Sequence, residues 1–180
     1  YGYVHYEDGT RLGEREGDEP QFDPGVLTEG NTTYLYTGFC ARGDKSRTGA
    51  KVVELGEDML TIKVGPKLVV PGCEYSEGSS FVGHEYFEAA SIRKVEDTYY
   101  FIYSSIVMHE LCYATSKNPM GPFTYQGRIL EPVIGWTTHH SIAQIEGEWY
   151  LFYHDSELSE GCSHKRCVKY TKLNIREDGT

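Results

Sequence analysis

Three segments of the chain share one pattern, and this repeat constrains the fold more than any other feature. They begin at Asp23 ("DPGVLTEGNTTYLYTGF"), Glu88 ("EAASIRKVEDTYYFIYSS") and His139 ("HHSIAQIEGEWYLFYHD"). Each consists of a polar first residue, a short strand-like stretch, a polar turn and an aromatic strand. The first residues are 65 and 51 positions apart. Periods of this size, with several strands in each, are typical of the blades of a β-propeller.

Aromatic residues fall at the same spacing in the three segments. A tyrosine lies eleven positions after each first residue, and a second aromatic residue lies thirteen positions after the same first residue. The two sets are Tyr34, Tyr99 and Tyr150, and Tyr36, Phe101 and Phe152. Twenty glycines separate short runs rich in Val, Ile, Tyr and Phe, and helical periodicity is nearly absent. We therefore predict an all-β protein, a partial propeller with about three four-stranded blades.

The repeat predicts that three distant polar residues meet. The innermost strand of each blade lines the central channel, so Asp23, Glu88 and His139 are expected at one end of the axis. Each residue alone has an ordinary explanation, because "DPG" is a common turn, Glu88 could lie at a strand edge and "HH" could be a solvated loop. A carboxylate in an apolar setting is costly unless it is paired or has chemistry to perform. The shared register favours a converging site.

The charge balance excludes several classes of partner. The 180 residues include 17 Lys+Arg and 27 Asp+Glu, which gives a net charge of −10. This argues against nucleic acid or an anionic membrane surface as a partner. No apolar run approaches the roughly 18 residues of a membrane-spanning helix. Aromatic residues make up 13% of the chain, and aromatic rings can stack on the apolar faces of sugars.

The five cysteines do not form a disulfide framework. They are Cys40, Cys73, Cys112, Cys162 and Cys167. Five cannot all pair and their spacing is irregular, so free thiols and a cytoplasmic location are predicted. "CSHKRC" with His164 could form a metal knuckle, but a second ligand pair at zinc-finger spacing is missing and an ordinary loop is favoured. "HELC", from His109, lacks the second histidine of a zinc-protease helix.

Five segments resemble, in order, the later part of glycoside hydrolase family 43: "FDPGVLTEGNTTYLYTGF", "FEAASIRKVEDTYYFIYSS", "LCYATSKNPMGPFTYQGRIL", "THHSIAQIEGEWYLFYHD" and "HKRCVKYTKLNIREDGT". That family comprises inverting β-xylosidases, α-L-arabinofuranosidases and arabinanases on a five-bladed propeller. The resemblance implies a glycosidase acting on xylose- or arabinose-containing plant glycans. It also implies one catalytic domain over 1–180, in which 1–21 connects from a missing blade and 22–80, 81–130 and 131–180 are blades three, four and five.

The resemblance assigns roles to the three converging residues. Glu88 is the general acid, and Asp23 tunes the pKa of the acid and orients it. The family more often has Gly-Pro where this chain has Ala89–Ala90, so the loop after the acid is expected to differ in shape. His139 matches a channel histidine that often supports a calcium ion. Thr138 replaces the usual glycine before it, which weakens this metal assignment.

The remaining expected contacts are with the substrate, an oligo- or polysaccharide. Arg166 resembles an arginine that contacts the substrate in xylosidases. Phe22 and Tyr86 are expected to form walls of the sugar site, and His139 could hydrogen-bond a hydroxyl group or a metal-bound water. No cofactor is required, although a structural calcium ion is compatible with the resemblance.

The catalytic base of the family, an aspartate of the first blade, has no counterpart here. Asp8 and Asp18 precede Asp23, but neither has the sequence context of the family's catalytic base. Because residue 1 is Tyr1, we expect a fragment or processed piece that is inactive alone and able to self-associate through open blade edges. The alternative function is a non-catalytic carbohydrate-binding propeller that lost the base. A structural propeller without a ligand would not explain the matched polar positions.

Overall fold

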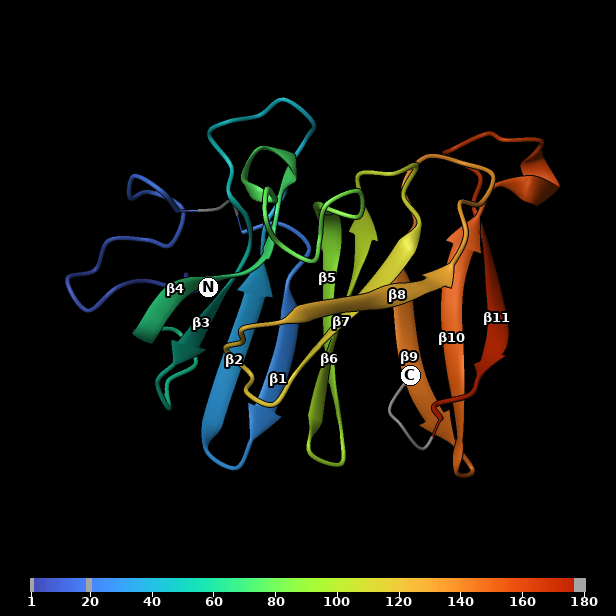
Figure 1. The fold of residues 1–180 in the computed structure, drawn as a ribbon. Helices are drawn as coiled ribbons and strands as arrows, with labels where there is room; N and C mark the ends of the chain where they lie inside the picture. The colour runs from blue at the N-terminus through green and yellow to red at the C-terminus, as the bar shows by residue number, and fades with distance from the viewer. Residues whose placement is uncertain (1, 19–20, 177–180) are drawn as a thin grey trace.

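The computed structural model describes residues 2–18 and 21–176, which form three antiparallel sheets (Figure 1). The first has the order β1 (Gly25–Glu29), β2 (Thr32–Thr37), β3 (Gly49–Leu55) and β4 (Ile62–Pro71). The second has the order β5 (Tyr86–Val95), β6 (Thr98–Ser105), β7 (Leu111–Ser116) and β8 (Thr124–Leu130). The third has the order β11 (Cys167–Leu173), β10 (Glu148–Asp155) and β9 (His140–Ile145).

This architecture confirms the all-β class and fits a partial propeller, with one correction. The third sheet has three strands among the described residues, not the four predicted, because residues 174–176 leave β11 without forming a strand. Two short 3-10 helices, η1 (Cys73–Tyr75) and η2 (Glu157–Ser159), lie in loops. Neither these nor any other helix in the described ranges has the length and apolar character needed to cross a membrane.

Two-residue turns set the direction of the first two strands in every sheet. The turns begin at Gly30, Glu96 and Glu146, with φ of 57°, 52° and 50°. Positive φ in a two-residue turn matches the right-handed twist of the flanking strands. As a result β1, β5 and β9 all start at the same end of their sheets, the upper end in Figure 1.

The second sheet is packed on both faces. Toward the first sheet, the rings of Phe101 and Tyr36 lie 5.7 Å apart and both side chains are fully buried. Toward the third sheet, Ile102 packs with Ile142 and Leu151. Burial on both sides explains why β6, "TYYFIYSS", lacks the polar–apolar alternation of a half-exposed strand.

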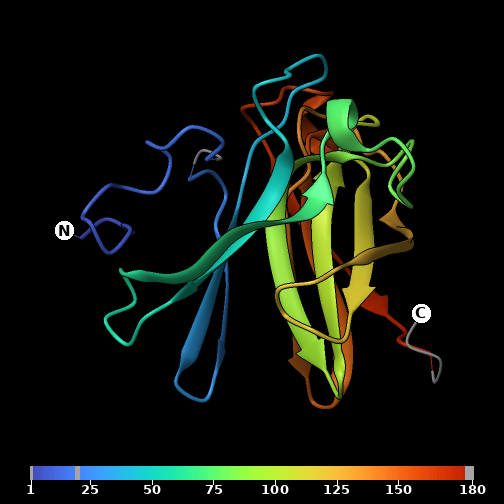
Figure 2. The same ribbon diagram turned by 60° about the vertical axis from the view of Figure 1, so that its left-hand side comes forward.

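The two outer faces of the three-sheet stack differ. The N-terminal segment lies beside the first sheet (Figure 2), where Tyr6 and Leu12 are buried against β2, β3 and β4. On the third sheet, Tyr170 contacts Tyr150 and Phe152 at ring distances of 6.3 and 6.1 Å. These rings lie on the face opposite Leu151, because side chains alternate along a strand, and Tyr170 is 69% exposed. The third sheet therefore carries an exposed aromatic face.

A bulge in β5 corrects the predicted repeat register. The β5–β6 pairing shifts register twice near the start of β5. Tyr36 is the fifth residue of β2, and Phe152 is the fifth residue of β10. The fifth residue of β6 is Ile102, so Ile102 rather than Phe101 is their counterpart. A one-residue slip turns a side chain to the other face of a sheet. The predicted equivalence of Tyr99 and Phe101 with the other aromatic pairs is therefore wrong.

Small residues allow β1 and β5 to approach each other beside this bulge. A Cβ atom added at Gly25 would lie 2.7 Å from the carbonyl oxygen of Ala90, so this position requires glycine. Ala89 has a φ of 63° and both alanines are buried. The Ala89–Ala90 pair thus lets β5 bulge next to β1. Glu88 directly precedes this pair.

Candidate active site

The first residues of the three repeated segments meet, as the repeat predicts. Asp23 lies two residues before β1, Glu88 lies near the start of β5, and His139 directly precedes β9. One ligand atom of each residue lies within 4.8 Å of the other two. The two register shifts in β5 lie on either side of Glu88, between Tyr86 and Glu88 and between Glu88 and Ser91, and Glu88 still converges with the other two residues.

His139 stands between the two carboxyl groups. Its Nε2 atom lies 3.4 Å from Oδ2 of Asp23 and 3.4 Å from Oε1 of Glu88. Asp23 Oδ2 also accepts a hydrogen bond from the Ala89 N–H at 3.2 Å. Glu88 is 4% exposed, and its buried Oε1 atom has no hydrogen-bond partner within the described residues. The site thus holds a buried carboxyl group that faces His139 beyond hydrogen-bond distance, beside a second carboxyl group that the Ala89 N–H anchors.

The electrostatics of the three residues favour a positively charged His139 between the two carboxyl groups. Glu88 raises the pKa of His139, burial opposes the rise, and the charge of Asp23 adds to it. Burial raises the pKa of Asp23, while His139 lowers it and Glu88 raises it further. His139 therefore keeps its proton to higher pH than an ordinary histidine does.

A small pocket of about 190 Å³ lies beside Asp23 and His139. Its lining is Asp23, Pro24, Ala89, Ala90, His139 and His140. Burial lowers the pKa of His140 to about 3, so this second histidine stays neutral. Both alanines are buried at this pocket, and a loop shape that differs from the Gly-Pro form of the family stays a prediction.

The structure separates the two aromatic residues predicted to line the sugar site. Phe22 is 44% exposed and its ring lies 5.1 Å from that of Phe39, so it remains available to a ligand. Tyr86 is 0% exposed, and its hydroxyl donates to the Gly38 carbonyl at 3.1 Å. The prediction for Tyr86 is wrong, because its side chain points into the core between the first and second sheets.

Arg166 precedes β11 and is exposed. Its Nε atom donates to the Ser163 carbonyl at 2.8 Å. Its charge opposes protonation of His139 and, after burial, lowers the pKa of His154. Arg166 is thus within electrostatic reach of the site, and its contact with substrate stays a prediction.

The three converging residues do not by themselves fit a calcium ion. Calcium takes six to eight oxygen ligands in proteins. Asp23 and Glu88 supply two carboxyl groups, and His139 supplies a nitrogen that stands between them. We derive no chemical step through calcium at this group.

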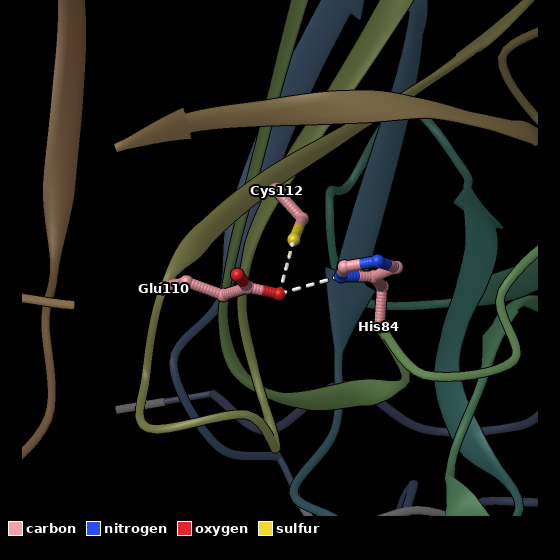
Figure 3. Close-up of side chains that lie close together, drawn as sticks. All are labelled: His84, Glu110 and Cys112. Carbon is pink, nitrogen blue, oxygen red and sulfur yellow. Dashed lines mark hydrogen bonds and ion pairs between the residues drawn. The ribbon is translucent and has the colours of Figure 1, made fainter. Parts of the chain in front are cut away.

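A second group of polar side chains surrounds Glu110 at the start of β7 (Figure 3). Its Oε1 atom lies 2.6 Å from Nδ1 of His84 and accepts from Ser105 at 3.0 Å and from Cys112 at 3.3 Å. Its Oε2 atom lies 3.3 Å from Arg128. Glu110 is 1% exposed. Because its neighbours are all donors, this carboxylate ties β7, the end of β6 and the segment before β5 together.

Replacing Glu110 is expected to cost stability in a pH-dependent way. Burial would raise the pKa of Glu110, but hydrogen bonds from His84, Cys112 and Ser105 lower it overall. A lowered pKa stabilises the fold above the ordinary glutamate pKa of about 4.3, and this contribution disappears as the pH falls through the folded-state value. Glu110→Gln should therefore lower the free energy of unfolding by roughly 2–4 kcal/mol at pH 7, with a smaller difference at pH 3.

Urea unfolding of the two proteins at both pH values measures this effect. Glu131→Gln is the matched control, because Glu131 is 68% exposed and pairs with the same Arg128 at 2.8 Å. Equal stabilities of the Glu110→Gln and Glu131→Gln proteins at pH 7 would contradict the assignment of Glu110 as a structural centre.

Sequence reasoning set Glu110 aside as part of an incomplete zinc-protease motif. A usable signal was present, because Glu110 directly precedes the apolar strand "LCYATS", much as Glu88 opens a strand. A carboxylate in that setting needs partners. The donors that satisfy it come from residues 84, 105 and 128, and the sequence does not reveal their proximity. The segment "CSHKRC" forms the favoured loop that leads into β11, no cysteine forms a disulfide, and Cys167 donates to Asp155 at 2.9 Å.

Glycoside hydrolases cleave glycosidic bonds with carboxyl groups, one of which acts as a general acid, and the buried Glu88 suits that chemistry. Residues 5–180 match the glycosyl hydrolases family 43, and the chain belongs to this family.

Relatives with curated names agree with this family. A xylosidase/arabinosidase of Thermoclostridium stercorarium is 56% identical over 195 residues, which is 100% of this chain and 41% of that protein. A xylosidase/arabinosidase of Bacteroides ovatus is 41% identical over 83% of this chain and 46% of that protein. The chain thus spans less than half the length of these relatives.

Solved structures give the same picture of the fold. A β-xylosidase/α-arabinofuranosidase from a compost metagenome, solved with xylotriose in a calcium-free form, is 35% identical with a TM-score of 0.76. The match covers 92% of this chain and 58% of that one. A family enzyme of Xanthomonas citri complexed with xylose is 36% identical with a TM-score of 0.74, over 88% and 54%. The five-bladed propellers of such relatives accommodate the three sheets as part of their fold.

Proposed function

We propose that this chain forms the acid side of an inverting glycoside hydrolase site that cleaves xylose- or arabinose-containing plant glycans. The observation that carries the proposal is Glu88, a buried carboxyl group whose Oε1 atom makes no hydrogen bond to the described residues and lies 3.4 Å from His139, beside Asp23. Names of relatives that combine xylosidase and arabinosidase support the substrate class. In this proposal the three sheets are the third, fourth and fifth blades of the propeller, with boundaries near residues 22, 81 and 131.

In the proposed mechanism Glu88 donates a proton to the glycosidic oxygen as the bond breaks. Phe87, which is 6% exposed, keeps water away from the acid. His139 lies 3.4 Å from a carboxyl oxygen of Asp23 and of Glu88, and its positive charge lowers the pKa of Asp23. The Ala89 N–H fixes Asp23 in place. Phe22, His139 and Arg166 are the groups proposed to contact the sugar.

Asp23 does not suit the role of the base. An inverting enzyme keeps its two catalytic carboxyl groups about 6.5–9.5 Å apart to hold a water between the sugar and the base. Asp23 and Glu88 have oxygens within 4.8 Å, which leaves no such space. Asp8 pairs with Arg15 at 2.7 Å, and Asp18 accepts the Tyr6 hydroxyl, so both serve the N-terminal segment. We therefore place the base outside residues 1–180.

The alternative function is a carbohydrate-binding propeller without catalysis. It gains no support from relatives named as xylosidases and arabinosidases. Catalysis by proton transfer requires no cofactor, and none enters the steps above.

The stereochemistry of the product tests this proposal. The full-length protein, with whatever residues its gene encodes beyond these 180, is expected to release xylose from the end of xylotriose with inverted configuration, seen first as the α-anomer by proton NMR. A separation near 5–5.5 Å is typical of retaining enzymes, in which the second carboxylate is a nucleophile. Release of the β-anomer would therefore make Asp23 a nucleophile and contradict the proposed roles.

A further inference from the structure

Five rings form a continuous line of contacts around Glu88. The centroid distances are 5.1 Å for Phe22–Phe39, 5.2 Å for Phe39–Phe87, 4.8 Å for Phe87–His109 and 4.6 Å for His109–Trp136. We call these five residues the aromatic arc. It joins the segment before β1, the start of β5, the loop before β7 and the loop before β9. The arc therefore spans all three sheets at the end where the acid lies.

The middle of the aromatic arc is buried and its ends are exposed. Phe87 and His109 are 6% and 9% exposed, whereas Phe22 and Trp136 are 44% and 61% exposed. Tryptophan side chains are on average largely buried. Here the indole stands edge-on to a buried ring, at an interplanar angle of 73°. That ring in turn contacts the residue preceding the acid, so Trp136 offers its surface to solvent within two ring contacts of Glu88.

The backbone that carries Trp136 is held in place. The Ser156 N–H donates to the Ile134 carbonyl at 2.7 Å. A Cβ atom added at Gly135 would lie 2.8 Å from the Ser156 hydroxyl oxygen, so the loop and Ser156 are in close contact. Thr137 has a φ of 58°, a conformation that costs energy in a non-glycine residue and is concentrated at functional sites. A platform fixed before binding loses little entropy when a ligand arrives.

The loop that carries His109 shows the same features. Met108 and His109 have φ of 51° and 60°, and the next residue is the anchored Glu110. The Nδ1 atom of His109 is buried and has no partner among residues 2–18 and 21–176. A buried polar atom without a partner is costly unless a ligand or water satisfies it. Burial lowers the pKa of His109 and the charge of Glu88 raises it, which places this imidazole within reach of the acid.

We propose that Trp136, seated on His109, is the platform on which the sugar of the leaving group stacks. The proposal rests on the proposed function and names its ligand, the pyranose ring of a xylo-oligosaccharide on the leaving-group side. A general acid protonates the oxygen of the leaving group, so the leaving sugar binds next to Glu88, where Phe87 and His109 lead to the exposed indole of Trp136. An indole ring packs on the apolar face of a pyranose and excludes water from the bond that breaks.

Two substrates separate this role from a structural one. Xylotriose has a leaving sugar, whereas β-xylosyl fluoride has the same first sugar and none to stack on Trp136. In the full-length protein, Trp136→Ala should lower kcat/KM for xylotriose about tenfold and leave kcat/KM for the fluoride unchanged. Trp136→Phe should recover most of the loss. Ile134→Ala is the matched control, because Ile134 is a 55% exposed apolar residue of the same loop outside the aromatic arc, and it should change neither value.

The outcomes are distinct. An equal loss on both substrates would show that Trp136 supports the loop rather than the leaving sugar, and no loss on xylotriose would show that the ring does not contact it. Either result would overturn the platform while leaving the proposed function intact. Absence of turnover on both substrates by the unsubstituted protein would overturn the proposed function, and the platform with it.

Discussion

Glu88→Gln in the full-length protein is expected to lower kcat for xylotriose by about 10²–10⁴-fold, the usual contribution of a general acid. Glutamine has nearly the same shape and keeps the contacts of the buried side chain, but it cannot donate the proton that the leaving sugar requires. The substitution does remove the charge that faces His139 at 3.4 Å, so thermal unfolding of the variant is measured beside kcat. We expect the loss to lie mainly in kcat, with the variant still folded.

Glu85→Gln is the matched control for this experiment. Glu85 is also a buried glutamate, 9% exposed and three positions earlier, but its carboxylate accepts from Ser76 and the Gly83 N–H, each at 3.0 Å. Its replacement is expected to cost stability in thermal unfolding and to leave kcat unchanged. Similar losses of kcat in the two variants would mean that Glu88 has no special role.

The second large effect concerns the 180-residue chain alone, which is expected to retain less than about a thousandth of the turnover of the full-length protein. An inverting reaction needs a base opposite the acid, and we place that base outside these residues. The third sheet also leaves Tyr170 and its neighbours exposed to water, so the cleft lacks a wall on that side. Open water weakens the field of preorganised groups that stabilise the transition state.

The measurement is hydrolysis of xylotriose and of aryl arabinofuranosides by the chain and by the full-length protein at equal concentration. Circular dichroism of the chain serves as the control, because the β-sheet signal must be present for the comparison to hold. Turnover by the folded chain equal to that of the full-length protein would show that the base lies within residues 1–180. It would also reject the assignment of the three sheets to blades three to five.

The sequence was sufficient to predict which residues converge. Polar residues that open three similar hairpins must meet if the hairpins are blades, and Asp23, Glu88 and His139 do meet. The register within the blades was not predictable in the same way. The bulge in β5 adds one residue to the strand, yet the sequence spacing from Glu88 to Tyr99 is 11, the same as in the other two segments. The spacing therefore hides the bulge. A pattern of aromatic residues on both faces does not reveal which face each one occupies.

Side-chain direction also explains the error at Tyr86 and the omission of Trp136. A tyrosine next to Phe87 and Glu88 has equal reason to face the cleft or the core, and packing against Phe101 and Tyr103 decides for the core. Trp136 lies in a loop without periodicity, so no pattern marks it. Its relation to the acid depends on His109 from another sheet, a contact that only the folded chain contains.

The central claim is that Glu88 supplies the proton to the leaving group, and its most direct test is the dependence of rate on that group. Aryl xylosides whose phenols range from weakly to strongly acidic need progressively less proton donation. For the full-length protein log kcat should vary little along this series. For Glu88→Gln it should fall steeply as the phenol becomes less acidic and approach the unsubstituted rate for the most acidic phenols. Parallel lines, with the variant slower by the same factor on every substrate, would contradict the account.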